Sequence, residues 1–154
     1  MIPSELSKIE KQILLRAPRE RVWRAITNIG EFSKWFGVDT AGVFEPGARL
    51  QMTSTHEGHK GIEFFVIIEQ MEPMRLFSWR WHPGAPQPGV DYSTEPTTLV
   101  QFQLEDAEHG TLLTVIESGF DRLSLGRRAK VFAENEAGWE FELKSLDRYV
   151  GPSA

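Results

Sequence analysis

Cysteine is absent from this chain of 154 residues. Its absence excludes disulfide bonds, thiolate nucleophiles, cysteine-bound zinc and iron–sulfur clusters. Long apolar runs are missing too, so we predict no membrane span. The first residues lack the apolar core of a signal peptide, and we therefore expect a cytoplasmic protein.

Clustered positive charge is equally scarce. Lysine and arginine number 17 against 22 aspartates and glutamates, which gives a net charge of −5. Since nucleic-acid binding depends on clustered basic side chains, we expect no nucleic-acid partner. No glycine-rich phosphate loop, dinucleotide-binding fingerprint or nucleophile elbow occurs, and we predict no cofactor.

The composition is typical of one globular domain. Apolar residues make up 40% of the chain and charged residues 25%, which allows a core without covalent cross-links. We predict a single domain over residues 1–154, with flexible tails at 1–5 and 151–154.

Alternation of apolar and polar residues predicts seven strands. They cover residues 6–16, 38–44, 48–55, 62–71, 75–82, 97–105 and 111–118. Two helices, 19–29 and 31–36, are expected after the first strand, with a break at Gly30. Because short turns join most consecutive strands, the pattern favours an antiparallel sheet.

The longest helical pattern covers residues 132–150. One apolar stripe runs along it, formed by Phe132, Trp139, Leu143, Leu146 and Val150. A sheet covered on one face by such a helix is an α+β fold.

Five motifs, taken in order, resemble one protein family. They lie at residues 13–27, 35–36, 77–83, 117–120 and 135–139, the last followed by Leu143 and Leu146. These motifs are similar to those of the homologues of the heat-shock-protein-90 ATPase activator. That family belongs to the SRPBCC superfamily of START, birch-pollen-allergen and polyketide-cyclase proteins.

The resemblance implies a helix-grip fold, in which a curved antiparallel sheet of about six to seven strands wraps around the C-terminal helix. It also implies a cavity between sheet and helix, where many relatives bind apolar small molecules. The eukaryotic activators carry an additional chaperone-binding domain before this one. We expect no room for it in this chain, so the resemblance does not predict chaperone activation.

Aromatic residues dominate the predicted inner face of the sheet. Large flat rings between sheet and helix suit an apolar or aromatic ligand. The alternative is that the rings fill the core, the commoner role of aromatic residues at strand spacing. For a cavity, the predicted ligand-binding set is Trp35, Phe64, Phe77, Trp79, Trp81, Phe102, Glu117, Asn135, Trp139 and Leu143.

Glu117 shares its predicted strand face with Leu113 and Val115. A carboxylate that faces an apolar interior is costly unless it is paired or protonated. One interpretation is a general acid or base, with His82 or Tyr92 as helpers. The favoured interpretation is structural, with hydrogen bonds or a salt bridge to Arg127, Arg128 or Asn135.

Other polar residues carry weaker signals. Glu142, at the edge of the helical stripe, is predicted to be solvated. His56 and His59 lie on a turn with poor geometry for one ion, so we predict no metal site. The proline-rich segment 83–96 is expected to form a loop near the cavity entrance, where Tyr92 is either a lid or an exposed residue.

Three functions are compatible with these patterns. Non-catalytic binding of a small apolar or aromatic molecule is the leading hypothesis, with His82 at the cavity mouth. The second is a cyclase- or hydratase-type enzyme that uses Glu117. The third is an interaction module for a chaperone, another protein or a second copy, indicated by an exposed apolar patch around Phe141, Trp35 and Phe36.

Overall fold

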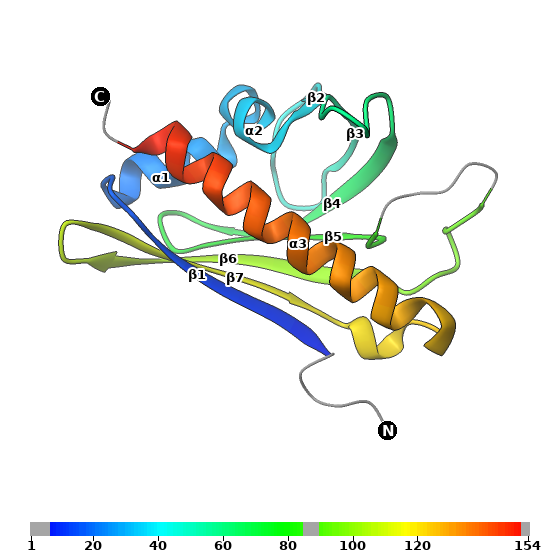
Figure 1. The fold of residues 1–154 in the computed structure, drawn as a ribbon. Helices are drawn as coiled ribbons and strands as arrows, with labels where there is room; N and C mark the ends of the chain where they lie inside the picture. Colours follow the sequence, from blue (N-terminus) through cyan, green and yellow to red (C-terminus); the bar gives the residue numbers. More distant parts are fainter. Residues whose placement is uncertain (1–6, 85–89, 152–154) are drawn as a thin grey trace.

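A computed structural model describes residues 7–84 and 90–151 of the chain. The tails predicted at 1–5 and 151–154 lie outside the described residues, apart from Gly151. Figure 1 shows the elements in order along the chain. Their bounds are β1 (Lys8–Leu15), α1 (Arg19–Thr27), α2 (Ile29–Phe36), β2 (Val38–Thr40), β3 (Arg49–Ser54), β4 (Glu63–Glu72), β5 (Leu76–Trp81), β6 (Thr98–Ala107), β7 (Gly110–Ser118) and α3 (Leu125–Val150).

The strands form one seven-stranded antiparallel sheet in the order β1-β7-β6-β5-β4-β3-β2. From β2 to β7 each strand pairs with the next strand in the chain. The first strand, β1, pairs with the last strand, β7, over the whole length of β1. The long helix α3 crosses one face of the curved sheet, and α1 and α2 lie near the C-terminal end of α3 (Figure 1). The predicted α+β helix-grip fold is confirmed.

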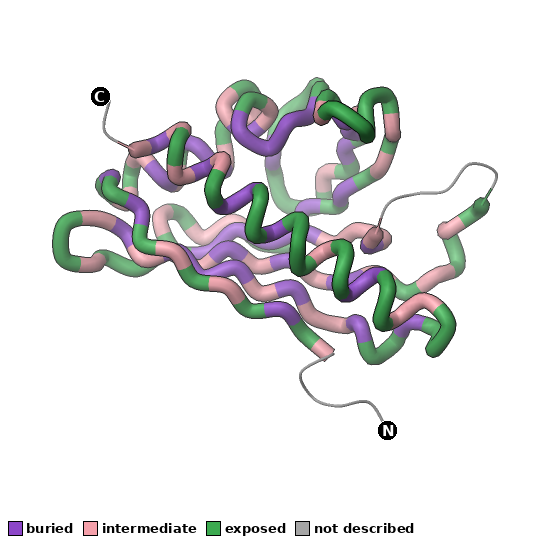
Figure 2. The backbone as a smooth tube through the Cα atoms, in the orientation of Figure 1, coloured by how far each residue is buried: buried purple, intermediate pink, exposed green. Residues whose placement is uncertain are grey.

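The helix α3 is longer than predicted. It begins at Leu125, whereas the sequence predicted a start at residue 132. The prediction missed the first turns because residues 125–130 carry no apolar stripe that would reveal a helix. Arg128 stabilises this start by donating to the carbonyl oxygens of Asp121 and Leu123, each at 2.7 Å. Further along, one side of α3 is buried against the sheet (Figure 2).

The boundary between α1 and α2 lies at Asn28 and not at Gly30. The Asn28 side-chain oxygen accepts a hydrogen bond from the backbone N–H of Glu31 at 3.0 Å and caps α2. Gly30 therefore lies in the first turn of α2 instead of breaking a helix. The helix ends at Gly37, whose φ of 74° is a left-handed conformation that favours glycine.

The strand predicted at 38–44 ends at Thr40 in the structure. Phe44 is nevertheless buried, because its ring packs 5.2 Å from Phe32 and 5.3 Å from Phe77, measured between ring centroids. Phe44 is apolar because it packs into the core from a loop. In the sequence, such a residue looks like the continuation of the strand.

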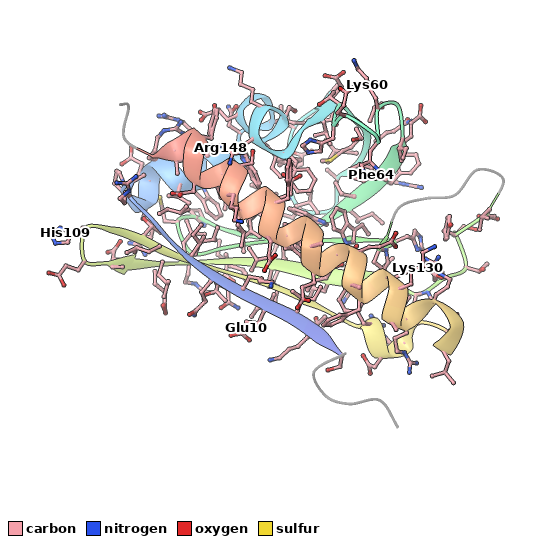
Figure 3. The ribbon with its side chains drawn as sticks, viewed as in Figure 1. Glu10, Lys60, Phe64, His109, Lys130 and Arg148 are labelled. Atoms are coloured by element: carbon pink, nitrogen blue, oxygen red, sulfur yellow. The ribbon has the colours of Figure 1, made fainter. Side chains whose placement is uncertain are left out.

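The middle of the layer between α3 and the sheet is filled by side chains, while the labelled charged residues lie at the surface (Figure 3). Trp79 sits near its centre, with its ring centroid 5.2 Å from Phe102 and 6.3 Å from Trp139. Such tilted and edge-on contacts each add about 0.5–1.5 kcal/mol beyond the burial of area. The centre of the domain is therefore a solid aromatic core.

Candidate functional site

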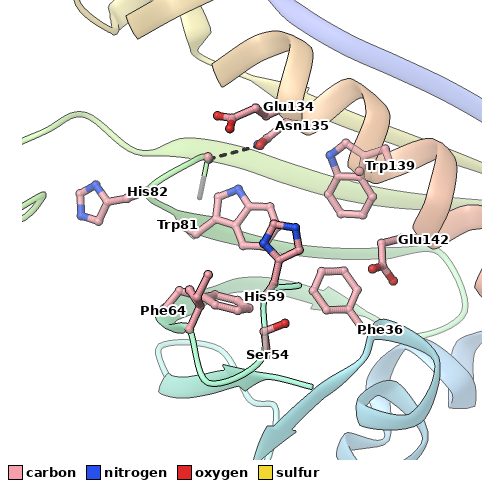
Figure 4. Close-up of a pocket in the computed structure, with 13 residues that line it drawn as sticks. Phe36, Ser54, His59, Phe64, Trp81, His82, Glu134, Asn135, Trp139 and Glu142 are labelled. Atoms are coloured by element: carbon pink, nitrogen blue, oxygen red, sulfur yellow. Dashed lines mark hydrogen bonds between the residues drawn. The ribbon is translucent and has the colours of Figure 1, made fainter. Parts of the chain in front are cut away.

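A cavity of about 200 Å³ opens where α3, the end of β5 and the segment between β3 and β4 meet (Figure 4). Its apolar walls are Phe36, Ile62, Phe64, Trp81 and Trp139. Its polar lining comes from Ser54, His59, His82, Glu134, Asn135 and Glu142. Mostly apolar walls with a few polar groups are usual for a small-molecule site.

One face of α3 contributes a row of residues to the cavity wall. Glu134, Gly138 and Glu142 are spaced four apart, so they follow one another along the same face of the helix. A Cβ atom added to Gly138 would meet no atom within 4 Å. Because Gly138 is exposed and lines the cavity, a longer side chain at this position would start from open space at the edge of the cavity.

Glu117 lies behind the aromatic walls and has no exposed surface. Its Oε1 accepts hydrogen bonds from Trp139 Nε1 at 2.8 Å and Asn135 Nδ2 at 2.9 Å. Its Oε2 accepts from Trp81 Nε1 at 2.8 Å and Thr98 Oγ1 at 2.6 Å. The inward-facing carboxyl thereby links β7 to β5, β6 and α3.

The hydrogen-bonding capacity of Glu117 is used up by these contacts. A carboxylate offers about four lone-pair sites, and four side-chain donors already occupy them. Trp81 and Trp139 each donate their only polar group, the indole N–H, to this carboxyl, so their rings present apolar surface to the cavity. The network positions the two indole walls.

Two of the three partners predicted for Glu117 bind elsewhere. Arg127 forms a salt bridge with Glu95, with its Nε 2.7 Å from a carboxylate oxygen. Arg128 holds the start of α3, as described above. Only Asn135 reaches Glu117, because it lies one helical turn before Trp139 on the side of α3 that faces the sheet.

Glu142 is buried, with an exposed fraction of 8%, which corrects the prediction that it is solvated. His56, in the segment after β3, packs against this part of α3. Glu142 Oε1 lies 2.8 Å from His56 Nε2, whereas Oε2 is buried and has no hydrogen-bond partner among the described residues. Burial raises the pKa of Glu142 to about 9.

His56 is held against the end of α2. Its Nε2 lies 2.9 Å from the carbonyl oxygen of Phe36, one of the last carbonyls of α2, which have no partner within the helix. A Cβ atom on Gly37 would overlap the imidazole, so glycine is needed for this approach. The Phe141 ring packs edge-on against the imidazole at 5.1 Å between centroids.

The cavity brings together four of the ten predicted ligand-binding residues, namely Phe64, Trp81, Asn135 and Trp139. Five others do not line it and are buried in the core, namely Trp35, Phe77, Trp79, Phe102 and Leu143. Glu117 lies behind the wall. Core residues and cavity residues both face inward, so the strand pattern cannot distinguish one kind from the other. A binding role for any of the ten stays a prediction.

Several lining residues were not among those predicted. Ile62 lies just before β4 and alternates with Phe64 in the sequence, a signal that would have included it. Ser54 and His59 come from a strand end and a turn, where no periodicity shows which way a side chain points. Gly138 carries no signal, since it contributes by lacking a side chain.

His82 lines the cavity, and its Nδ1 is buried without a hydrogen-bond partner among the described residues. In Figure 4 its ring points away from Phe64 and Trp81. Tyr92 does not line the cavity but a second hollow, and the guanidinium of Arg127 lies 5.0 Å from its ring centroid. Within the loop predicted at 83–96, residues 85–89 lie outside the described part.

The patch predicted around Phe141, Trp35 and Phe36 is not formed. Phe141 is 53% exposed, but Trp35 and Phe36 are buried between α2 and the sheet. A homodimer contact through Phe141 stays a prediction.

No three His, Asp or Glu side chains within residues 7–84 and 90–151 are grouped as a metal ion requires. Over the same ranges, no helix combines the length and the apolar character needed to cross a membrane.

The fold and the cavity define a helix-grip domain of the SRPBCC type. Residues 16–151 match the family described as "Activator of Hsp90 ATPase homolog 1-like protein", and the chain belongs to this family. The resemblance seen in the sequence is thereby confirmed. Family and fold are those of a ligand-binding domain or a chaperone-associated module. A comparison with curated proteins found no match.

Solved bacterial structures share this fold. Protein Ms6760 from Mycobacterium smegmatis has a TM-score of 0.78 at 14% identity, over 99% of this chain and 95% of that one. Protein MLL2253 from Mesorhizobium loti has a TM-score of 0.71 at 20% identity, over 92% and 95%. The Aha1 dimer from Colwellia psychrerythraea has a TM-score of 0.70 at 20% identity, over 93% and 95%. At these identities the similarity shows the fold alone.

Proposed function

We propose that the protein binds a small, largely apolar molecule with a single ring in the cavity beside α3. The observation that carries this proposal is the cavity itself, walled by four aromatic rings and one isoleucine. Aromatic walls bind a flat ligand by burying its faces. The polar groups gathered along α3 would set the orientation of the ligand.

The size of the cavity limits the ligand. Its volume of about 200 Å³ is below the range of about 300–1,000 Å³ that is usual for drug-sized ligands. It exceeds the roughly 150 Å³ of an apolar cavity that accepts benzene. One ring with a short substituent fills this volume, whereas a long acyl chain or a steroid would extend out of it.

Hydrogen bonds to one buried carboxyl hold two of the aromatic walls in place. Trp81 and Trp139 lie 6.0 Å apart between ring centroids, and both donate their N–H groups to the buried Glu117. Less conformational entropy is lost on binding when the site is already ordered. This arrangement supports a binding role, and it leaves Glu117 without a free lone pair for the acid–base work of a cyclase or hydratase.

Titration with isopropylbenzene, followed by tryptophan fluorescence, tests this proposal. We expect saturable binding to the wild-type protein, because Trp81 and Trp139 border the cavity. Gly138→Leu places a side chain in the empty space and should weaken binding at least about tenfold. Gly126→Leu is the matched control, since Gly126 also has no atom within 4 Å of its added Cβ and does not line the cavity.

Two results would contradict the proposal. One is a wild-type titration without saturation. The other is equal affinity of the wild-type protein and Gly138→Leu, with circular dichroism showing that both variants are folded. Either would mean that the cavity beside α3 is not where the probe binds.

A further inference from the structure

Two residues that line the cavity each carry a buried polar atom without a hydrogen-bond partner among the described residues, His82 at Nδ1 and Glu142 at Oε2. Glu142 is buried and lines the cavity from α3. Its Oε1 contacts His56, but its Oε2 has no hydrogen-bond partner within residues 7–84 and 90–151. An unpaired buried polar atom costs about 1–3 kcal/mol. A ligand that pairs with Oε2 would recover this cost.

The contacts of His56 show which carboxyl oxygen is free to carry a proton. His56 Nε2 lies 2.9 Å from the Phe36 carbonyl oxygen and 2.8 Å from Glu142 Oε1. A carbonyl oxygen only accepts hydrogen bonds, so Nε2 must carry the hydrogen and donate it. Glu142 Oε1 is then an acceptor as well. Because Oε1 already accepts from His56, we place the proton of the neutral carboxyl on Oε2, the oxygen without a partner.

The surroundings of Glu142 favour that protonated form. Its pKa is raised to about 9 by burial, so the carboxyl is neutral at pH 7. His56 is the titratable group that contacts it, and the other titratable groups in the described cavity lining are His59 from the segment after β3, His82 from the end of β5 and Glu134 from α3. Among the described lining residues there is no lysine or arginine that would stabilise a carboxylate.

We propose that Glu142 donates a hydrogen bond from Oε2 to a neutral oxygen acceptor on the bound molecule, so that the site selects a small aromatic or cyclic ketone. This inference rests on the proposed function, because it names the ligand class of the same cavity. A neutral buried carboxylic acid is a strong, directional donor in an apolar site. Its counterpart is a carbonyl group, with the ring of the ligand against the aromatic walls.

Other polar ligands match the cavity less well. An amine would need an ionised Glu142 as its partner. A carboxylate would have to lose its hydration close to Glu134, with no lysine or arginine in the described lining to compensate. A plain hydrocarbon would fill the apolar space but leave Oε2 unpaired. A site with a buried donor discriminates against an analogue that lacks the acceptor.

A set of four probes of nearly equal size tests this selectivity. Acetophenone carries the carbonyl, isopropylbenzene is its hydrocarbon counterpart, 1-phenylethylamine is the cation and benzoate is the anion. At pH 7 we expect acetophenone to bind about tenfold more tightly than isopropylbenzene, the gain from one added hydrogen bond. The amine and benzoate should bind more weakly than acetophenone. The ketone preference should disappear at pH values well above 9, where Glu142 ionises.

Two substitutions assign the preference to Glu142. Glu142→Leu should remove the preference for acetophenone and leave isopropylbenzene binding intact. Glu142→Gln should keep the preference, because its amide oxygen can accept from His56 while its N–H group donates into the cavity. In that variant the preference should no longer change with pH.

The possible outcomes separate this inference from the proposed function. Equal binding of acetophenone and isopropylbenzene to the wild-type protein would overturn the inference but leave the proposed function intact. Tightest binding of the amine would show an ionised Glu142 and would also overturn it. If neither neutral probe binds, the proposed function fails and the inference fails with it.

Discussion

Glu117 and Glu142 are both buried beside the same cavity, yet the protein surrounds them in opposite ways. Four side-chain donors from three different elements converge on Glu117 and occupy both of its oxygens. Glu142 has one contact, to a histidine, and its second oxygen is left without a partner among the described residues.

The difference shows how a structural carboxyl differs from one that is available to a ligand. A buried polar group with all its hydrogen bonds made holds surrounding elements in place. A buried polar group with one atom unpaired has hydrogen-bonding capacity left for another molecule. Burial alone does not separate the two cases, so the number of donors around each carboxyl is the useful observation.

Removal of Glu117 should have the largest effect on stability. Glu117→Leu leaves two indole N–H groups, a threonine hydroxyl and an asparagine amide without their acceptor, and should lower the free energy of unfolding by about 3–5 kcal/mol. Urea unfolding at pH 7 measures this loss. The matched variant, Glu142→Leu, loses one hydrogen bond but also removes a buried carboxyl with an unpaired oxygen, so it should lose far less stability than Glu117→Leu or gain some. Equal losses in the two variants would contradict the comparison.

The pH dependence of stability should come next, because its effect is smaller at each pH unit although it adds up over several units. The Glu142 carboxyl has an ordinary pKa of 4.5 and a folded-state pKa of about 9. Between these pH values the unfolded chain has released a proton that the folded protein keeps. The free energy of unfolding therefore falls as pH rises across this window, by at most about 1.4 kcal/mol per pH unit.

Glu142→Gln supplies the reference for that measurement, because a glutamine does not ionise. Subtracting its urea-unfolding free energies from those of the wild-type protein removes the contribution of all other titrating groups. The difference should decline steadily between pH 5 and pH 9. A difference that stays constant over this range would show that Glu142 is ionised in the folded protein.

Gly37→Ala should have a smaller effect, localised at His56. The residue has a positive φ, and its added methyl group would overlap the imidazole. We expect a loss of about 1–3 kcal/mol, from backbone strain and from displacement of His56 away from Glu142. Gly47→Ala is the control, since Gly47 also has a positive φ but no atom within 4 Å of the added Cβ. Histidine NMR signals should change in the first variant only.

The smallest effect is expected for Gly138→Ala. Alanine replaces glycine inside a helix, where it is favoured by about 0.5–1 kcal/mol, and the added methyl group meets no atom. The thermal midpoint should therefore rise slightly while the affinity for isopropylbenzene falls. A lower midpoint would mean that the backbone at this position is not an ordinary helix.

The sequence predicted most of the fold because local patterns report which face of an element is buried. Alternation placed the seven strands, and the stripe from Phe132 to Val150 identified the part of α3 that covers the sheet. The same logic predicted that Glu117 faces inward with Val115. It missed the first turns of α3 and the cap at Asn28, where a few polar contacts replace periodicity.

Only the tertiary structure decided which inward-facing residues border empty space. Trp79 and Trp81 follow the same strand alternation, but α3 and the ring cluster enclose the first and leave the second beside the cavity. The pairing of His56 with Glu142 joins residues 86 positions apart. Periodicity tells which side of an element is buried, whereas a hydrogen-bond partner or a gap depends on how distant elements cross, and that is a property of the folded chain.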